Sequence, residues 1–222
     1  MLLYILQQEN ALELLRQQFP ILVLFVFALI FSLTFHEYGH GKVASMIGDD
    51  TAQRAGRVTL NPLPHIDPVG LLMVLLIGIG YAKPVPTDAR KFNTRWGILL
   101  VAAAGPAMNL LLAVITINLY LIGLKAGWAL FHYPGAQILF YYLPLINMLL
   151  MLFNLIPLGP LDGSYILPYM LSREAAAKYI MFNQRYGSYM LLGLIALHFL
   201  GLPFFETLWA MGEFLLNVVA VV

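Results

Sequence analysis

The stretch FPILVLFVFALIFSLTF, residues 19–35, is an unbroken apolar run that passes directly into HEYGH, residues 36–40. About 20 apolar residues are enough for a helix to cross the hydrocarbon core of a bilayer. Ionisable groups in such a segment are costly, at about 2.5–3.5 kcal/mol each at a helix centre, so they need a functional reason. The combination predicts a membrane-spanning helix with a reactive or ligand-binding group near its end.

The composition indicates a polytopic membrane protein. Of the 222 residues, 61% are hydrophobic and 10% are charged, whereas soluble domains usually contain about 25% charged residues. Apolar stretches cover approximately residues 21–35, 69–82, 97–124, 138–156, 186–200 and 202–222. The stretch 69–82 is short for a span and rich in glycine, so we expect it to be re-entrant.

We therefore expect an all-α polytopic membrane protein with about five transmembrane helices and one short re-entrant segment. An amphipathic pattern in residues 1–19 predicts an N-terminal interfacial helix, with a short polar lead-in as the alternative. The run RVTL favours a small β element near residues 54–60. We find no internal repeat and expect a single membrane-embedded domain over residues 1–222.

The HEYGH stretch has the spacing of a metal site. His36 and His40 lie four residues apart, so both imidazoles can reach one ion from the same helix face. Glu37 lies about 100° round the helix and can reach a water without being a ligand. In the H-E-x-x-H arrangement, the histidines bind zinc and the glutamate is the general base. Because the chain has no cysteine, any zinc ion must be held by histidine and carboxylate.

A catalytic zinc usually has three protein ligands, so a third ligand must lie elsewhere in the chain. The candidates are Asp162, Glu206, Glu213, Asp67 and His65. Asp162 is favoured because it lies in NLIPLGPLDGS, where prolines and glycines interrupt the helix directly after an apolar span. A simple turn at the membrane surface is the alternative for this stretch.

Topology and charge both favour Asp162. If residues 69–82 are re-entrant, Asp162 emerges on the same side of the membrane as the two histidines. Only Arg16 and Lys125 then lie on the opposite side. The basic residues that share the side of the histidines are Lys42, Arg54, Arg57, Lys83, Arg90, Lys91, Arg95, Arg173, Lys178 and Arg185. The positive-inside rule makes that side cytoplasmic.

The motifs HEYGH, NPLPHIDPVG, AGPAMNLL and NLIPLGPLDGS, in this order, resemble the site-2 protease family of intramembrane zinc metalloproteases, in its compact bacterial form. The resemblance covers roughly residues 30–170. It implies a metalloendopeptidase that cleaves peptide bonds in or near transmembrane segments of other proteins. It also implies that one Zn²⁺ is bound by His36, His40 and Asp162 and that Glu37 activates water.

We expect the single domain to comprise an interfacial helix (1–19), a catalytic core (20–170) and C-terminal helices (186–222). Asn154 falls in the motif that precedes Asp162 and is a candidate for binding substrate, with a hydrogen bond between helices as the alternative. Asn109 is expected to orient a zinc ligand or to bridge helices. His65 is expected either to support the ligating histidines from outside the ligand set or to lie in a capped surface turn.

The expected partners are transmembrane protein substrates and the lipid bilayer, with no role for nucleic acid and no indication of the oligomeric state. The expected location is the bacterial cytoplasmic (inner) membrane, with the active site toward the cytoplasm. Two other functions remain open. A zinc-binding transporter would need the ligands but not Glu37, and a non-catalytic scaffold would bind transmembrane segments without cutting them.

Overall fold

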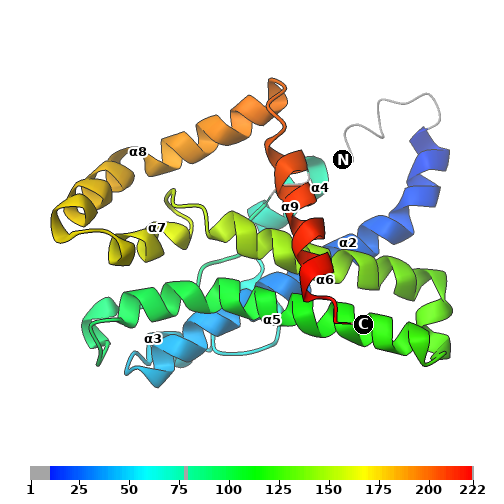
Figure 1. Cartoon of the computed structure of the whole chain (residues 1–222), viewed down its shortest axis with the longest axis horizontal. Coiled ribbons are helices and arrows are strands. Elements are labelled where there is room, and N and C mark those ends of the chain that lie inside the picture. Colours follow the sequence, from blue (N-terminus) through cyan, green and yellow to red (C-terminus); the bar gives the residue numbers. More distant parts are fainter. Residues whose placement is uncertain (1–10, 78–79, 222) are drawn as a thin grey trace.

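The computed structural model describes residues 11–77 and 80–221, and within these residues the fold is entirely helical (Figure 1). The α-helices are α2 (Ala11–Met46), α3 (Thr51–Arg54), α4 (Pro68–Ile77), α5 (Gly97–Lys125), α6 (Pro134–Asn154), α7 (Gly163–Ile166), α8 (Arg173–Phe199) and α9 (Phe204–Val219). Short 3-10 helices are η1 (Leu63–His65), η2 (Ala89–Lys91), η3 (Ala129–His132) and η4 (Leu167–Met170).

Helices α2, α5 and α6 pack against one another and form the centre of the fold (Figure 1). Fully buried alanines, Ala28 of α2 and Ala113 of α5, lie against the large apolar side chains of α6. Small residues at such contacts let helix backbones approach closely. Helix α9 joins the same core through Leu216.

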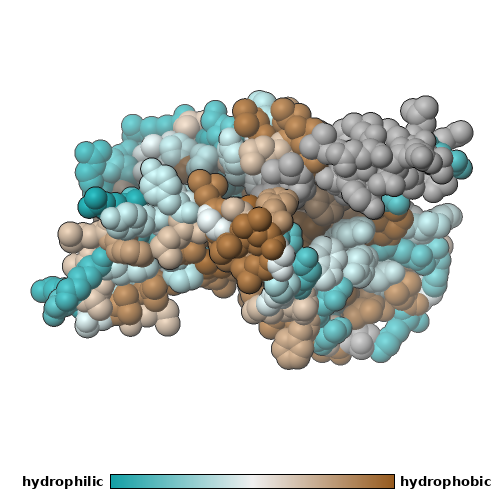
Figure 2. Space-filling view, turned by 90° about the horizontal axis from the view of Figure 1, so that it is seen from above, coloured by the Kyte–Doolittle hydropathy of each residue, from teal (hydrophilic) through white to brown (hydrophobic). Residues whose placement is uncertain are grey.

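The protein is an integral membrane protein. Within residues 11–77 and 80–221, three helical stretches are long and apolar enough to cross a bilayer: Gln18–Met46, Gly97–Lys125 and Pro134–Asn154. Large apolar side chains such as Leu111 and Ile115 are exposed on α5, and apolar side chains gather in the middle of the face in Figure 2. These surfaces suit contact with lipid.

The expected count of about five spans is not reproduced in the described part of the chain. Helices α8 and α9 meet at an angle of 94° and add a fourth span only if the pair counts as one broken span. Gly201 lies in the break with a φ of +103°, a backbone conformation that glycine adopts readily. The break therefore turns the chain sharply where two separate spans were expected.

Helix α4 is too short to cross the membrane. Its ten residues rise about 15 Å, which is half of the roughly 30 Å hydrocarbon core. Its re-entrant placement stays a prediction. Because α5 and α6 run in opposite directions, α7, α3 and the first turns of α5 lie at the same end of the bundle (Figure 1).

The predicted β element near residues 54–60 is wrong, since this segment contains a helix end, a turn and bends. The N–H of Arg57 donates to the carbonyl of Ala52, and the carbonyl of Thr59 accepts a hydrogen bond from the ring of His65. The part of the chain that the structure describes contains no strand with which the β-branched residues here could form a ladder. Strand propensity depends on such a partner surface.

Two predicted helix boundaries also differ. Residues 1–10 of the expected interfacial helix lie outside the described residues, and residues from Ala11 onward form the first turns of α2, which continues through Pro20. At the other end, the C-terminal helices begin before the expected bound of residue 186, because α8 starts at Arg173 with Ser172 as its N-cap, as the serine and glutamate of SREAAAKY indicate. The run REAAAK after Ser172 consists of residues with high helix propensity, so the helix forms there although the run is polar.

Candidate metal centre

The structure brings the three predicted ligands together. Helix α2 places His36 and His40 one turn apart, and the loop between α6 and α7 places Asp162 opposite them. The Nε2 atoms of the two histidines are 3.0 Å apart. Asp162 Oδ2 lies 3.2 Å from His36 Nε2 and 3.4 Å from His40 Nε2.

These distances suit a tetrahedral zinc ion. With zinc–ligand bonds of about 2.0–2.1 Å, two neighbouring ligand atoms of a tetrahedron lie about 3.3 Å apart. Asp162 Oδ2 is buried and has no hydrogen-bond donor among the described residues. A Cβ built on Gly105 would lie 2.4 Å from His40 Nε2. The absence of a side chain at Gly105 therefore keeps the space beside the ligands open.

Each histidine is oriented through its other ring nitrogen. His40 Nδ1 lies 2.6 Å from the carbonyl oxygen of Val101, and His36 Nδ1 lies 2.7 Å from Asn109 Oδ1. Both partners are oxygen acceptors, so both Nδ1 atoms must donate a proton. In a neutral imidazole the lone pair then lies on Nε2, which is the atom that faces Asp162. Two imidazole lone pairs and one carboxylate oxygen converge on one point, which suits a cation.

The orientation of the Asn109 amide is fixed by a buried chain of hydrogen bonds. Asn109 Nδ2 donates to the Ser32 carbonyl at 3.2 Å and to Asn147 Oδ1 at 2.9 Å. Asn147 Nδ2 donates in turn to the Leu143 carbonyl at 2.8 Å. Both asparagines are fully buried. Since backbone carbonyls can only accept, the two amides can point only one way, and Asn109 must present its oxygen to His36.

Glu37 lies beside the ligands but is held by a different element. It is buried, and its charge is close enough to act on His40. Glu37 Oε2 accepts a hydrogen bond of 2.8 Å from the N–H of Val85. Val85 belongs to an extended segment, residues 80–88, between α4 and η2. This segment therefore passes directly over the carboxylate.

The extended segment is fastened at both ends. On one side, the N–H of Lys83 donates to the His65 carbonyl, and the buried side chain of Arg57 donates to the Lys83 carbonyl. On the other side, the N–H of Asp88 donates to Asp49 Oδ2 at 2.6 Å. These bonds fix the position of the amide that contacts Glu37.

Asp49 is a fully buried carboxylate just after the end of α2. Burial alone would raise its pKa. Hydrogen bonds from the Thr51 hydroxyl and from the N–H groups of Asp88 and Thr51, together with the charge of Lys91, more than offset this and hold the pKa of Asp49 below its ordinary value. The group is therefore an ionised anchor at neutral pH.

The remaining predicted residues are placed as follows. Asn154 is the last residue of α6, half-buried, and its Nδ2 donates to the Leu150 carbonyl of its own helix. His65 is buried, with Nε2 bonded to the Thr59 carbonyl and Nδ1 without a partner among the described residues. Glu206 and Glu213 lie on α9 and Asp67 caps the start of α4, so none of the three belongs to the ligand group.

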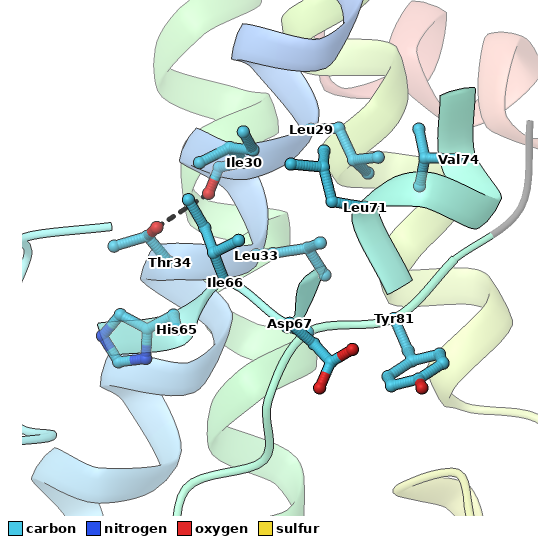
Figure 3. A pocket seen from close by; sticks show the side chains of 11 residues that line it. Leu29, Ile30, Leu33, Thr34, His65, Ile66, Asp67, Leu71, Val74 and Tyr81 are labelled. Carbon is cyan, nitrogen blue, oxygen red and sulfur yellow. Dashed lines mark hydrogen bonds between the residues drawn. The ribbon is translucent and has the colours of Figure 1, made fainter. Parts of the chain in front are cut away.

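His65 lines a separate small cavity of about 30 Å³ between α2 and α4. Figure 3 shows aliphatic side chains of the two helices around it, with His65 and Tyr81 on opposite sides. The volume suits about one water molecule. None of the three ligands lines this cavity, so it is distinct from the metal centre.

Sequence reasoning missed four contributors to the site: Ser32, Asn147, Val85 and the carbonyl of Val101. For Ser32 and Asn147 a signal exists, because polar side chains inside apolar spans usually bond to another helix. For the two backbone groups, no local pattern marks the residue.

Comparisons with known proteins agree with this geometry. The sequence pattern of peptidase family M50 matches residues 24–130 and 122–197. YwhC of Bacillus subtilis (strain 168), named as a candidate zinc metalloprotease, is 40% identical over 156 residues, which are 69% of this chain and 71% of YwhC. Rip2 of Mycolicibacterium smegmatis, named in the same way, is 32% identical over 155 residues, which are 64% of this chain and 55% of Rip2. No solved structure matches the chain.

Proposed function

The chain belongs to peptidase family M50, the site-2 protease family, and on that premise we propose that it is an intramembrane zinc metalloendopeptidase. It hydrolyses peptide bonds in or near transmembrane segments of other proteins. The observation that carries the proposal is the meeting of His36, His40 and Asp162 within 3.0–3.4 Å, two of them on a membrane-spanning helix that also bears Glu37.

A zinc ion would be held by Nε2 of His36, Nε2 of His40 and a carboxylate oxygen of Asp162, and a catalytic zinc with three protein ligands keeps its fourth position for water or substrate. When bound, zinc supplies a Lewis acid that polarises the scissile carbonyl and makes water more acidic. The hydrogen bonds from the two Nδ1 atoms to Asn109 and Val101 hold the imidazoles in the ligating tautomer.

Glu37 acts as the general base. The Val85 N–H occupies Oε2, so Oε1 is the oxygen available to take a proton from water. The same carboxyl group then delivers the proton to the departing amine nitrogen. The hydrogen bond from Val85 also keeps the carboxylate from turning away, which preserves the geometry that proton transfer requires.

The substrate is a membrane protein segment that unwinds near the site, since the backbone of a helix is shielded by its own hydrogen bonds. Asn154 is suited to bind the exposed backbone, because an amide both donates and accepts. An apolar cavity of about 450 Å³ between the end of α6 and the start of α9 is suited to the apolar side chains of such a segment. Its lining includes Leu155 and Ile156, which directly follow Asn154.

We place the protein in the bacterial cytoplasmic membrane with the site toward the cytoplasm. Helix α3, which ends at Arg54, lies at the end of the bundle where α2 meets Asp162, and η2, which carries Arg90 and Lys91, is paired to it through Lys91 and Asp50. A basic side is normally cytoplasmic. A protease-protection assay on vesicles with a tag after α3 tests this orientation. Cleavage of the tag only from the periplasmic side would refute it.

The test of the activity uses purified protein in detergent with a panel of single-span substrates. Wild type is compared with Glu37→Gln and with the control Glu206→Gln, whose side chain is 65% exposed on α9, and zinc content is measured for all three. We expect wild type and the control to cleave and Glu37→Gln to bind zinc without cleaving. Cleavage by Glu37→Gln would refute the general-base role. Zinc binding without cleavage by any of the three favours the transporter or scaffold alternatives.

A further inference from the structure

Helix α8 contacts the loop that presents Asp162, although it contributes no metal ligand itself. This loop, residues 155–161, joins α6 to α7. Pro157 and Pro160 have no N–H group, and the N–H groups of Leu155, Ile156, Leu158 and Leu161 donate to nearby backbone carbonyls, so the N–H of Gly159 is the one left for a side chain. Two of its backbone groups are bonded by side chains of α8 instead. The N–H of Gly159 donates to Asn183 Oδ1 at 2.8 Å, and the Tyr179 hydroxyl donates to the Pro157 carbonyl at 2.9 Å.

The contact is close and involves one face of α8. Tyr179, Asn183 and Gly187 are spaced four residues apart, so they lie along the same side of the helix. Gly187 is buried, and a Cβ built on it would lie 2.9 Å from the nitrogen of Gly159. A Cβ built on Gly159 would lie 2.8 Å from Asn183 Nδ2. Both glycines therefore permit the backbones of helix and loop to approach each other.

The rest of α8 is largely free of the bundle. It packs chiefly against η4 and α9 and lies apart from α5 in Figure 1. Met181, Tyr189 and Leu192 are 72%, 74% and 62% exposed. Such side chains face lipid or another membrane segment. A displacement of α8 by its surroundings would therefore pass to the loop through Tyr179 and Asn183.

We propose that Asn183 and Tyr179 are positioning residues for Asp162, through which α8 sets the geometry of the third zinc ligand. Zinc sites require ligand positions within about 0.2 Å. Pro157 and Gly159 are hydrogen-bonded to Tyr179 and Asn183 of α8 and lie three to five residues before Asp162. A change in their position therefore moves the Asp162 carboxylate. Residues that orient ligands in this way typically change metal affinity by 10–100-fold when they are substituted.

This inference rests on the zinc site of the proposed function but not on peptide hydrolysis, so it is tested by zinc affinity. Competition with a chromogenic chelator is measured for the purified full chain in detergent. Asn183→Leu removes the acceptor at similar size, Asn183→Asp retains an oxygen acceptor, and Gln184→Leu alters the exposed neighbour. We expect about tenfold weaker zinc binding for Asn183→Leu and wild-type affinity for the other two.

Thermal unfolding in the presence of excess chelator separates positioning from general damage. The apparent melting temperature of metal-free Asn183→Leu should match that of the metal-free wild type. If Asn183→Leu does not fold, Tyr179→Phe replaces it, since this variant loses only the hydroxyl bonded to Pro157. We expect about threefold weaker zinc binding for Tyr179→Phe.

Three outcomes overturn the inference in different ways. Wild-type zinc affinity in folded Asn183→Leu, or in Tyr179→Phe where that variant is used, shows that α8 does not set the ligand geometry, and it leaves the proposed function intact. Equal loss of affinity in Asn183→Leu and Asn183→Asp shows that the acceptor oxygen is not the cause. Failure of wild type to bind zinc overturns the metal site itself and the inference with it.

Discussion

Substituting Gly105 by alanine should block the metal site without unfolding the protein. The added Cβ would lie 2.4 Å from His40 Nε2 and 2.6 Å from His36 Cε1. Ordinary van der Waals contact begins at about 3.4 Å, so each ring must retreat by 0.8–1.0 Å. Zinc–ligand distances tolerate only about 0.2 Å. Both imidazoles would therefore leave ligating positions.

We expect Gly105→Ala to bind zinc at least about 100-fold more weakly than wild type, which corresponds to about 2.7 kcal/mol. Displacements of about 1 Å cost a similar factor in other precisely arranged sites. Movement of the two rings also strains the bonds from their Nδ1 atoms to Asn109 and Val101, which should cost about 1–3 kcal/mol of stability. Alanine is favoured over glycine in a helix interior by about 0.8–1.0 kcal/mol, which offsets part of this cost. Zinc affinity is therefore compared between folded proteins, and melting in excess chelator reports the stability separately.

The matched control is Gly193→Ala on α8, where a built Cβ meets no atom within 4 Å. Zinc affinity is measured by chelator competition for wild type and both variants, and cleavage of a single-span substrate is measured in parallel. The control should keep wild-type affinity. If folded Gly105→Ala binds zinc within threefold of wild type, then the ligand geometry argued above is incorrect.

Three further predictions follow from the same structure. Asn109→Leu removes the acceptor of His36 Nδ1 and should weaken zinc binding by about 10–100-fold, and unchanged affinity by chelator competition would contradict the assigned tautomer. Asp49→Asn should lower the apparent melting temperature at neutral pH. The folded-state pKa of Asp49 is lowered, so its ionised carboxylate stabilises the fold fully above the unfolded-state pKa of about 3.9, and this stabilisation is lost as the pH falls through the folded-state pKa. The difference in melting temperature between Asp49→Asn and wild type should therefore vanish only in strong acid. Chelation of zinc should destabilise wild type by about 2.7 kcal/mol relative to protein held at free zinc 100-fold above its Kd, and an unchanged melting temperature would argue against a folded-state metal.

The meeting of His36, His40 and Asp162 could be predicted because its signals are local or topological. The spacing of His36 and His40 follows from one helix, and the choice of Asp162 followed from its interrupted helix and from the short segment that fails to span. Membership of the site-2 protease family, now shown by the comparisons, was indicated by four short motifs in order.

Other features depend on contacts that no local pattern encodes. The bond from Val85 to Glu37 joins an irregular segment to a helix, and irregular backbone has no periodicity to read. The expected strand failed because RVTL meets no strand partner. The expected separate spans near the C-terminus are not confirmed, because neither α8 nor α9 alone is both long and apolar enough and the two helices meet at 94°. Pairing and bending of this kind are set by tertiary packing.

The hydrogen bonds that link the Leu143 carbonyl through Asn147 and Asn109 to His36 have a consequence for how the protein assembles. Helix α2 carries both histidines and Glu37, yet the proton position of His36 is fixed only when Asn109 of α5 and Asn147 of α6 are in place. Asp162 follows α6 in the chain. We therefore expect a folding intermediate in which α6 has not yet joined α2 and α5 to lack the candidate metal site.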